Sequence, residues 1–127
     1  VNTASVAGLF GGPGMPAYVA SKHGVLGLTK VASSDVAPRG IRVNAVCPGP
    51  VETRMMRSLE SQRNPNDPEG IHRAYAATMP TGRYTLPEEV AGVVLYLSSE
   101  LSGNVTGTHI VVDGGRSGSG GQPAARR

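Results

Sequence analysis

The stretch Ile41 to Pro50, which reads IRVNAVCPGP, decides the fold of this chain. Its first seven residues are mostly apolar and partly β-branched, a pattern typical of a strand that is buried on both faces. The Pro-Gly-Pro that follows ends the strand, because proline cannot donate to a sheet ladder and glycine favours a turn. We therefore predict a buried strand over residues 41–47 that runs directly into a loop.

A long helix is predicted just before this strand, over residues 17–37. Apolar residues recur there at helical spacing, Pro16 stands at the entrance, and the Pro-Arg-Gly at 38–40 ends the helix. In front of the helix, residues 1–6 predict a short strand that leads into a loop rich in glycine and proline.

After the Pro-Gly-Pro loop, residues 51–79 predict two short helices, separated by the Asn-Pro-Asn-Asp-Pro at 64–68. Another helix is expected to begin at Thr85, which precedes an acid by three residues and has a proline in the first turn. Residues 108–112, Thr-His-Ile-Val-Val, predict the last strand. Strands separated by helices of this length require crossover connections, so the sequence predicts an α/β fold with a parallel sheet covered on both faces.

The chain has 127 residues, with 12 Lys+Arg against 9 Asp+Glu, and two of the basic residues are Arg126 and Arg127. This leaves no basic face of the kind that binds nucleic acid. No run of about 18 apolar residues occurs, so we expect no membrane span. Residues 116–127 are rich in Gly, Ser and Arg and contain no large apolar residue, which predicts a disordered tail behind one ordered domain at 1–115.

Cys47 is the one cysteine of the chain, which agrees with a reducing cytoplasm, and we interpret it as a small buried hydrophobic residue. The three histidines, His23, His72 and His109, are too dispersed in the sequence for a metal site. We expect no bound metal.

Tyr18 and Lys22 lie four residues apart at the start of the long helix, so their side chains share one face. A free phenol, with a pKa of about 10, is a poor proton donor at neutral pH, and a nearby ammonium improves it. Ser5, at the end of the first strand, can be brought beside them to bond a substrate oxygen. Together the three suit interconversion of a carbonyl and an alcohol when a hydride carrier is present. The spacing is equally consistent with an exposed tyrosine covered by the aliphatic part of the lysine.

The segment Gly12 to Ala17 fits the pattern G-x-G-x-x-A between a strand and a helix, as a dinucleotide-binding loop does. Pro13 and Pro16 each remove a backbone N–H that such a loop would direct at a pyrophosphate. The next strand also ends in Cys47-Pro48 instead of an acid that would bind a ribose. We interpret the segment as a structural turn.

Several segments occur in an order typical of one family. They are Asn2-Thr3-Ala4-Ser5, Tyr18-Val19-Ala20-Ser21-Lys22, Ile41-Arg42-Val43-Asn44, Pro48-Gly49-Pro50-Val51-Glu52-Thr53, Gly82-Arg83, Pro87-Glu88-Glu89-Val90-Ala91, Val105-Thr106-Gly107 and Val112-Asp113-Gly114-Gly115. In these segments the chain resembles the short-chain dehydrogenases/reductases over nearly all of residues 1–115. The resemblance implies the last three strands of a Rossmann-like, doubly wound sheet, that is, the C-terminal catalytic half of an NAD(P)-dependent oxidoreductase.

The resemblance also implies site residues. Tyr18 would be the catalytic acid/base, Ser5 would position the substrate oxygen, and Lys22 would assist Tyr18 and bind the nicotinamide ribose. The residues implied to contact the cofactor are Tyr18, Lys22, Pro48, Gly49, Val51 and Thr53. The implied cofactor is NAD or NADP, the substrate a small alcohol or carbonyl compound, and the parent enzyme a cytoplasmic homodimer or homotetramer. In the family, the segment from Arg54 to Met79, which holds Met55, Met56, Tyr75 and Met79, covers the substrate. The alternative for this segment is an amphipathic pair of surface helices.

Two alternatives stand beside this interpretation. The family's phosphate loop, its ribose-binding residue and a fourth catalytic Asn are expected upstream of the position of Val1. The chain would then be a truncated, non-catalytic fragment without the dinucleotide-binding half, and we expect such a fragment to expose apolar surface. The other alternative is a relative that carries out epimerisation or hydration with the same Tyr and Lys.

Overall fold

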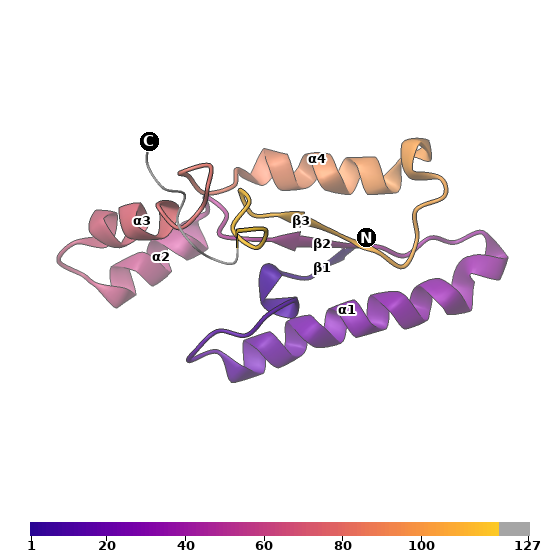
Figure 1. Cartoon of the computed structure of the whole chain (residues 1–127), viewed down its shortest axis with the longest axis horizontal. Helices are drawn as coiled ribbons and strands as arrows, with labels where there is room; N and C mark the ends of the chain where they lie inside the picture. The colour runs from indigo at the N-terminus through magenta and orange to yellow at the C-terminus, as the bar shows by residue number, and fades with distance from the viewer. Residues whose placement is uncertain (120–127) are drawn as a thin grey trace.

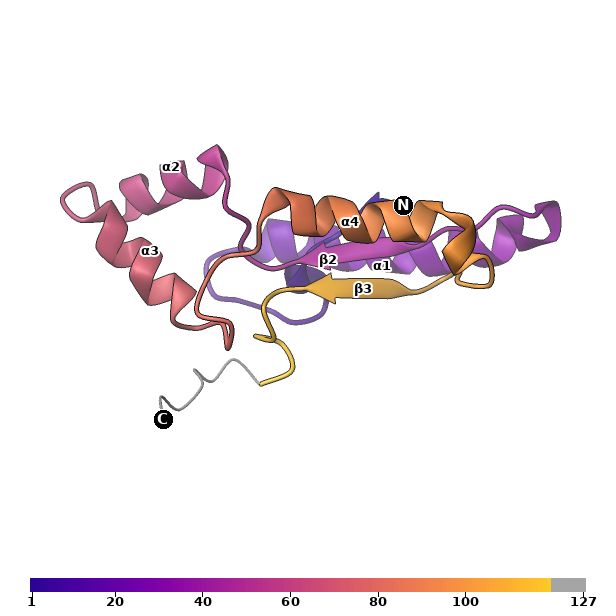
Figure 2. The same ribbon diagram turned by 90° about the horizontal axis from the view of Figure 1, so that it is seen from above.

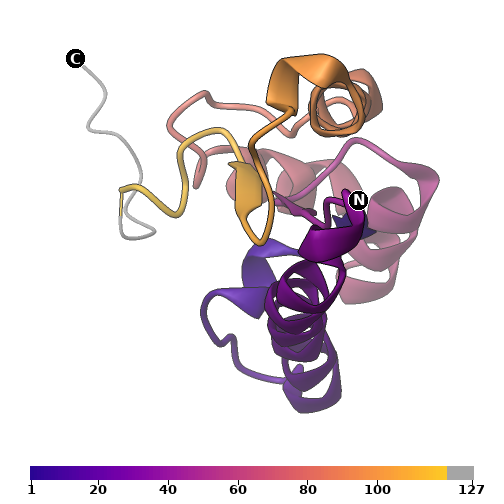
Figure 3. The ribbon, with the colours of Figure 1, turned by 90° about the vertical axis from the view of Figure 1, so that its right-hand side faces the viewer.

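The computed structural model describes residues 1–119 and shows three layers, with a parallel sheet between helices (Figure 1). The sheet order is β1-β2-β3, with β1 at Asn2–Thr3, β2 at Ala45–Pro48 and β3 at His109–Val112. Helix α1, Pro16–Val36, covers one face of the sheet and helix α4, Pro87–Ser98, covers the other (Figure 3). The predicted α/β class and parallel sheet are confirmed.

Helix α1 was predicted over 17–37 and spans Pro16–Val36. Pro16 occupies the first turn, where its missing N–H costs nothing. The inward face of the helix buries Leu26 and Thr29. A short 3₁₀ helix follows, and Gly40, with a φ of 72°, ends it in the left-handed region that favours glycine.

Strands β1 and β2 are shorter than predicted, because backbone N–H groups next to them bond side-chain hydroxyls instead of a neighbouring strand. The Ser5 hydroxyl accepts a bond of 3.1 Å from the Ala7 N–H and starts a 3₁₀ helix, which ends β1 early. Strand β2 begins at Ala45, not at Ile41, since the Val43 N–H bonds the Thr106 hydroxyl at 3.0 Å. The centre of β2 is fully buried, as predicted for a central strand.

The two predicted short helices are α2, Arg54–Arg63, and α3, Pro68–Ala76. They pack on each other and extend past the carboxyl end of the sheet (Figure 2). Helix α4 starts at Pro87, two residues later than predicted: Leu86 is the N-cap, and its N–H bonds the Glu89 carboxylate at 2.7 Å. Thr85 is not the cap because its hydroxyl donates to the Val112 carbonyl at 3.2 Å.

After β3, Asp113 organises the chain through side-chain bonds. Its two carboxylate oxygens accept from the N–H groups of Gly115 at 2.9 Å and Ser117 at 2.7 Å, and residues 116–119 form turns. The rest of the predicted tail lies outside the described residues. None of the helices within residues 1–119 is long and apolar enough to cross a membrane.

Candidate active site

The predicted catalytic residues all lie at the carboxyl end of the sheet. Ser5 follows β1, while Tyr18 and Lys22 occupy the first two turns of α1, which begins at that same end (Figure 2). The Lys22 Nζ lies 5.7 Å from the centroid of the Tyr18 ring. Nζ also donates a bond of 3.1 Å to the carbonyl of Thr3, which belongs to β1. The helix and the strand that carry the site are therefore tied together by the lysine itself.

A glycine allows this close approach of the two elements. Gly8 ends the 3₁₀ helix that Ser5 caps, and a Cβ at Gly8 would lie 2.6 Å from the carbonyl oxygen of Lys22. That distance is shorter than a van der Waals contact, so only glycine fits there without a shift. The segment after Ser5 thus packs directly against the backbone of α1 at the residue that supplies the ammonium.

The parallel register aligns Ser5 with the end of β2. Asn2 pairs with Ala45 and Thr3 with Val46, so the continued register places Ser5 level with Pro48. The Ser5 side chain is buried, and its oxygen accepts from the Ala7 N–H. Within residues 1–119 the structure records no acceptor for the Ser5 hydroxyl proton, which leaves that proton for another partner.

Four of the residues predicted to contact the cofactor lie at the end of β2 or just after it, and each has a structural partner. The first of them, Pro48, is the last residue of β2 and pairs with Val112. The Gly49 N–H donates to the Val112 carbonyl at 2.9 Å, and Val51 forms a parallel bridge with Thr85. The Thr53 hydroxyl caps α2 by accepting from the Met56 N–H at 3.3 Å. As with Ser5, the structure records no acceptor for the Thr53 hydroxyl proton among the described residues. The loop therefore keeps a free donor at this edge of the sheet.

The outward face of α2 borders a shallow groove of about 560 Å³ next to this loop. It is lined by Thr53, Arg54, Met55, Ser58, Leu59 and Gln62. Met55 is 69% exposed there, whereas Met56, Tyr75 and Met79 pack inside the α2–α3 pair. Of the large side chains noted in this segment, only Met55 faces the groove.

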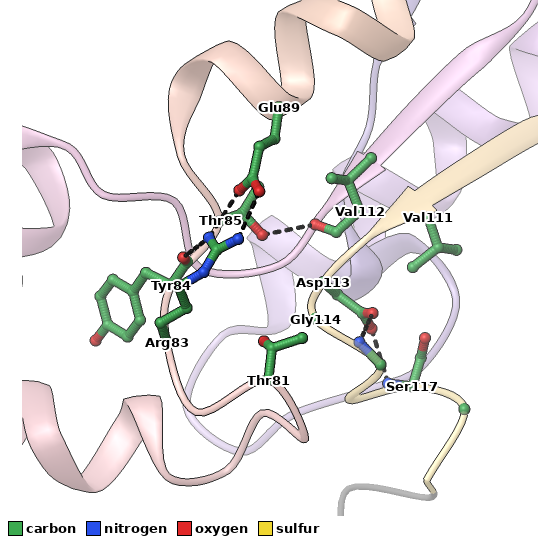
Figure 4. A pocket seen from close by; sticks show the side chains of 12 residues that line it. Thr81, Arg83, Tyr84, Thr85, Glu89, Val111, Val112, Asp113, Gly114 and Ser117 are labelled. Carbon is green, nitrogen blue, oxygen red and sulfur yellow. Dashed lines mark hydrogen bonds and ion pairs between the residues drawn. The ribbon is translucent and has the colours of Figure 1, made fainter.

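A second pocket, of about 450 Å³, lies between the start of α4 and the turn after β3 (Figure 4). Arg83 is engaged by the Glu89 carboxylate at 2.6 and 2.9 Å, and both oxygens of Asp113 are used within its own turn. Arg83, Glu89 and Asp113 are therefore already bonded within the protein, and we assign the pocket no chemistry.

Cys47 is fully buried in the sheet core, as the sequence indicated. Burial raises the pKa of its thiol, although a backbone hydrogen bond from Ser5 acts in the opposite direction. No group of three or more His, Cys, Asp or Glu within residues 1–119 could hold a metal ion.

Sequence reasoning missed one buried ionic cluster. Glu60 of α2 is 2% exposed and accepts hydrogen bonds from Tyr84 at 2.7 Å and from His72 Nδ1 at 3.1 Å. The three residues are 12 and 24 positions apart, so no local motif connects them. The alternation of polar and apolar residues along α2 was the one available signal, and it does not reveal a buried acid.

This geometry defines a Rossmann-like α/β protein whose candidate site residues lie at the carboxyl edge of the sheet. Residues 1–117 match the family described as enoyl-(acyl carrier protein) reductase. A 3-oxoacyl-(acyl-carrier-protein) reductase of Thermotoga maritima is 46% identical over 115 residues, which cover 91% of this chain and 44% of that protein. An oxidoreductase of Salmonella typhimurium, UcpA, is 45% identical over 103 residues, which cover 81% of this chain and 39% of that protein.

Solved structures are also similar to this chain. Levodione reductase superposes with a TM-score of 0.88 at 36% identity, over 93% of this chain and 46% of its own. The ligand-free aldohexose dehydrogenase of Thermoplasma acidophilum gives 0.88 at 34% identity, over 99% and 49%. The chain belongs to the short-chain dehydrogenase/reductase family. It spans less than half the length of these relatives, as a C-terminal portion does.

Proposed function

We propose that this chain carries the proton-transfer site of a nicotinamide-dependent oxidoreductase that interconverts an alcohol and a ketone. The observation that carries the proposal is the position of the Lys22 ammonium. It lies 5.7 Å from the Tyr18 ring and is anchored to the strand that ends at Ser5. A packed surface tyrosine would need no such anchor, whereas a catalytic phenol needs a fixed positive charge beside it.

The three side chains would divide the work as follows. Tyr18, 44% exposed, would give its hydroxyl proton to the oxygen of a carbonyl that is being reduced, or accept a proton from an alcohol. Lys22 would stabilise the negative charge that develops on the tyrosine oxygen. Ser5 would donate its free hydroxyl proton to the same substrate oxygen and so hold it in place.

The residues present fit a nicotinamide cofactor, NAD or NADP. Lys22 uses one recorded bond of its ammonium within the described residues, so further N–H groups can reach the ribose hydroxyls. Thr53 has its hydroxyl proton available, and Pro48, Gly49 and Val51 would supply backbone contacts at the same edge of the sheet. Such a cofactor, when bound, supplies or accepts the hydride.

The groove on α2 would contact the substrate. Met55 and Leu59 give its surface an apolar character, and both are well exposed. We therefore expect the substrate to present an apolar group on the side away from the reacting carbonyl.

A second reading is supported by the coverage of the relatives. The chain spans 39–46% of the curated relatives, so the isolated chain could belong to a family member without binding a dinucleotide. Titration of NADH and NADPH into the 127-residue chain separates the two readings. Micromolar binding supports the enzyme; absence of binding at millimolar cofactor supports the non-catalytic reading.

Substitution then tests the site. In a ketone-reduction assay with the bound cofactor, Tyr18→Phe should lower turnover by about 10²-fold or more, since it removes the transferable proton and little else. Tyr96→Phe is the matched control, because Tyr96 is also partly exposed but lies on α4. Equal effects of the two substitutions would contradict the assigned role. Turnover without net oxidation of the cofactor would favour a relative that catalyses epimerisation or hydration.

A further inference from the structure

Helices α2 and α3 form a unit with a core of its own. This core consists of Ala76 at the end of α3 and of Met79 and Tyr84 in the segment that follows α3, with Met56 and Tyr75 packed against it. The core of the sheet is a separate cluster that includes Leu26 and Cys47. The views from the front and from above both place α2 and α3 beyond the carboxyl end of the sheet (Figures 1 and 2). The orientation of this unit therefore depends on the segments that connect it to the sheet.

Two neighbouring segments join the unit to the sheet, and after α3 the Thr81 N–H also donates to the Gly114 carbonyl in the turn after β3 at 3.2 Å. Val51 and Thr85 form a parallel bridge, the Thr85 N–H donates to the Pro50 carbonyl at 3.0 Å, and the Glu52 N–H donates to the Thr85 carbonyl at 2.8 Å. Beyond this bridge α2 has no further backbone bond to the sheet among the described residues. A second attachment is needed to fix the direction in which α2 leaves the bridge.

The Glu60 carboxylate supplies that attachment. It lies two turns into α2 and accepts the Tyr84 hydroxyl at 2.7 Å, and Tyr84 is the residue directly before the bridge. His72 Nδ1 on α3 bonds the same oxygen, Oε1, at 3.1 Å. One acid thus connects α2, α3 and the segment that enters α4.

The charges around this acid are balanced by its neighbours. Among residues 1–119 the structure records no hydrogen-bond partner for Glu60 Oε2, but the Arg57 guanidinium lies 3.5 Å from it. Arg57 also pairs with Glu52 and Glu69, and His72 Nε2 lies 3.7 Å from Glu52. Burial alone would raise the pKa of Glu60. The hydrogen bonds from Tyr84 and His72 and the charges of His72 and Arg57 outweigh burial, so the pKa lies below its ordinary value.

We propose that Glu60 is a positioning residue: through Tyr84 and His72 it fixes α2 and α3 as one body and thereby holds Thr53 at the start of α2. The contact of Thr53 with a cofactor rests on the proposed function. The mechanical part of the proposal, that Glu60 fixes α2 and α3, does not. Loss of the attachment frees the angle of α2 and loosens the Thr53 cap. Since the cap bonds the Met56 N–H, the exchange of that amide reports the position of Thr53 directly.

Hydrogen exchange on the full 127-residue chain, without cofactor, tests the mechanical part. Tyr84→Phe removes the hydroxyl and keeps the ring against His72, and it should accelerate exchange at Met56 and along α2 and α3 by about tenfold or more. Exchange in the buried turns of α1 should stay the same. Glu69→Gln is the matched control, because it removes an exposed carboxylate from the same Arg57 and should change nothing.

A pH series provides a readout that packing alone would not move. The folded state lowers the Glu60 pKa, so its stabilising effect is complete above the ordinary value of 4.5 and is lost as the pH falls below it. Protection of α2 and α3 should therefore fall in acid in the wild type, and Glu60→Gln should lack that step.

Three results would overturn the proposal. The first is exchange in Tyr84→Phe that is unchanged from the wild type. The second is acceleration in α1 of Tyr84→Phe as large as in α2 and α3. The third is protection of α2 and α3 in the wild type that is no better than in an unstructured peptide. If exchange behaves as expected and no cofactor binds the wild type, only the proposed function fails.

Discussion

Gly8 lies against the backbone of Lys22, close enough that a Cβ on the glycine would come within 2.6 Å of the lysine carbonyl oxygen. This contact brings the segment after the first strand onto the helix that carries the ammonium. The site therefore depends on the absence of a side chain as much as on the side chains it uses.

Gly8→Ala is expected to lower the free energy of unfolding by about 1–3 kcal/mol, because the methyl group would push against backbone atoms that cannot move aside. Gly24→Ala is the control: Gly24 lies within α1 with nothing within 4 Å of its Cβ position, so alanine should raise stability by about 0.5–1 kcal/mol. Urea unfolding measures both. A Gly8→Ala protein as stable as the wild type would show that the contact is not tight.

Asn44 fastens the loop before β3. Its side-chain Nδ2 donates to the Val105 carbonyl at 2.7 Å, its Oδ1 accepts from the Thr108 N–H at 3.2 Å, and the residue is buried. Asn44→Ala should cost about 1–3 kcal/mol, since the Thr108 N–H loses its partner. Asn66→Ala, at an exposed position, should stay within about 0.5 kcal/mol in the same urea experiment. Similar losses for both variants would contradict this role.

Glu89 should make stability fall in acid. The side-chain bonds from Arg83 and then the N–H of Leu86 lower the pKa of Glu89 from 4.5 to about 2. A carboxylate with a depressed pKa in the folded state contributes stability above its unfolded value, and this contribution is lost as the pH falls towards the folded value. The urea midpoint of the wild type should therefore fall more between about pH 6 and about pH 3 than that of Glu89→Gln.

Glu88→Gln is the neighbouring control for this pH series. Its midpoint should follow the wild type across the range, because no ion pair of Glu88 is recorded among the described residues. If the urea midpoint of Glu89→Gln fell with pH as much as that of the wild type, the Arg83–Glu89 pair would not be the source of the loss of stability in acid.

Cys47 should resist thiol reagents while the chain is folded. Its side chain is fully buried, and burial raises the pKa of the thiol, so both access and the reactive thiolate are reduced. We expect its reaction with an aromatic disulfide reagent to be about tenfold slower or more in the native state than in urea. Equal rates would mean that the sheet opens readily.

Periodicity and breakers predicted the main elements of the fold. The helix placed at 17–37 is α1 at Pro16–Val36, and the two helices separated at 64–68 are α2 and α3. These signals are local, since they depend on residues within a few positions of one another. The predictions failed where a side chain bonded a distant backbone group, as at Thr85, whose hydroxyl binds the Val112 carbonyl instead of capping α4.

For the candidate site, spacing alone indicated that Tyr18 and Lys22 share a helix face, and the ammonium does lie near the ring. The attachment of Lys22 to Thr3 was not visible in the sequence, because it spans 19 positions. The Glu60 cluster was not predicted, because its partners are 12 and 24 positions away from Glu60. In addition, an acid in an amphipathic helix normally faces water. The catalytic roles themselves stay predictions until activity is measured.

The bridge between Val51 and Thr85 brings the two ends of the α2–α3 excursion together. A segment whose ends meet can be lengthened, shortened or exchanged at little cost to the scaffold, because closing it requires no rearrangement of the strands. Insertions or replacements between these two positions should therefore leave in place the sheet and the elements that carry Ser5, Tyr18 and Lys22.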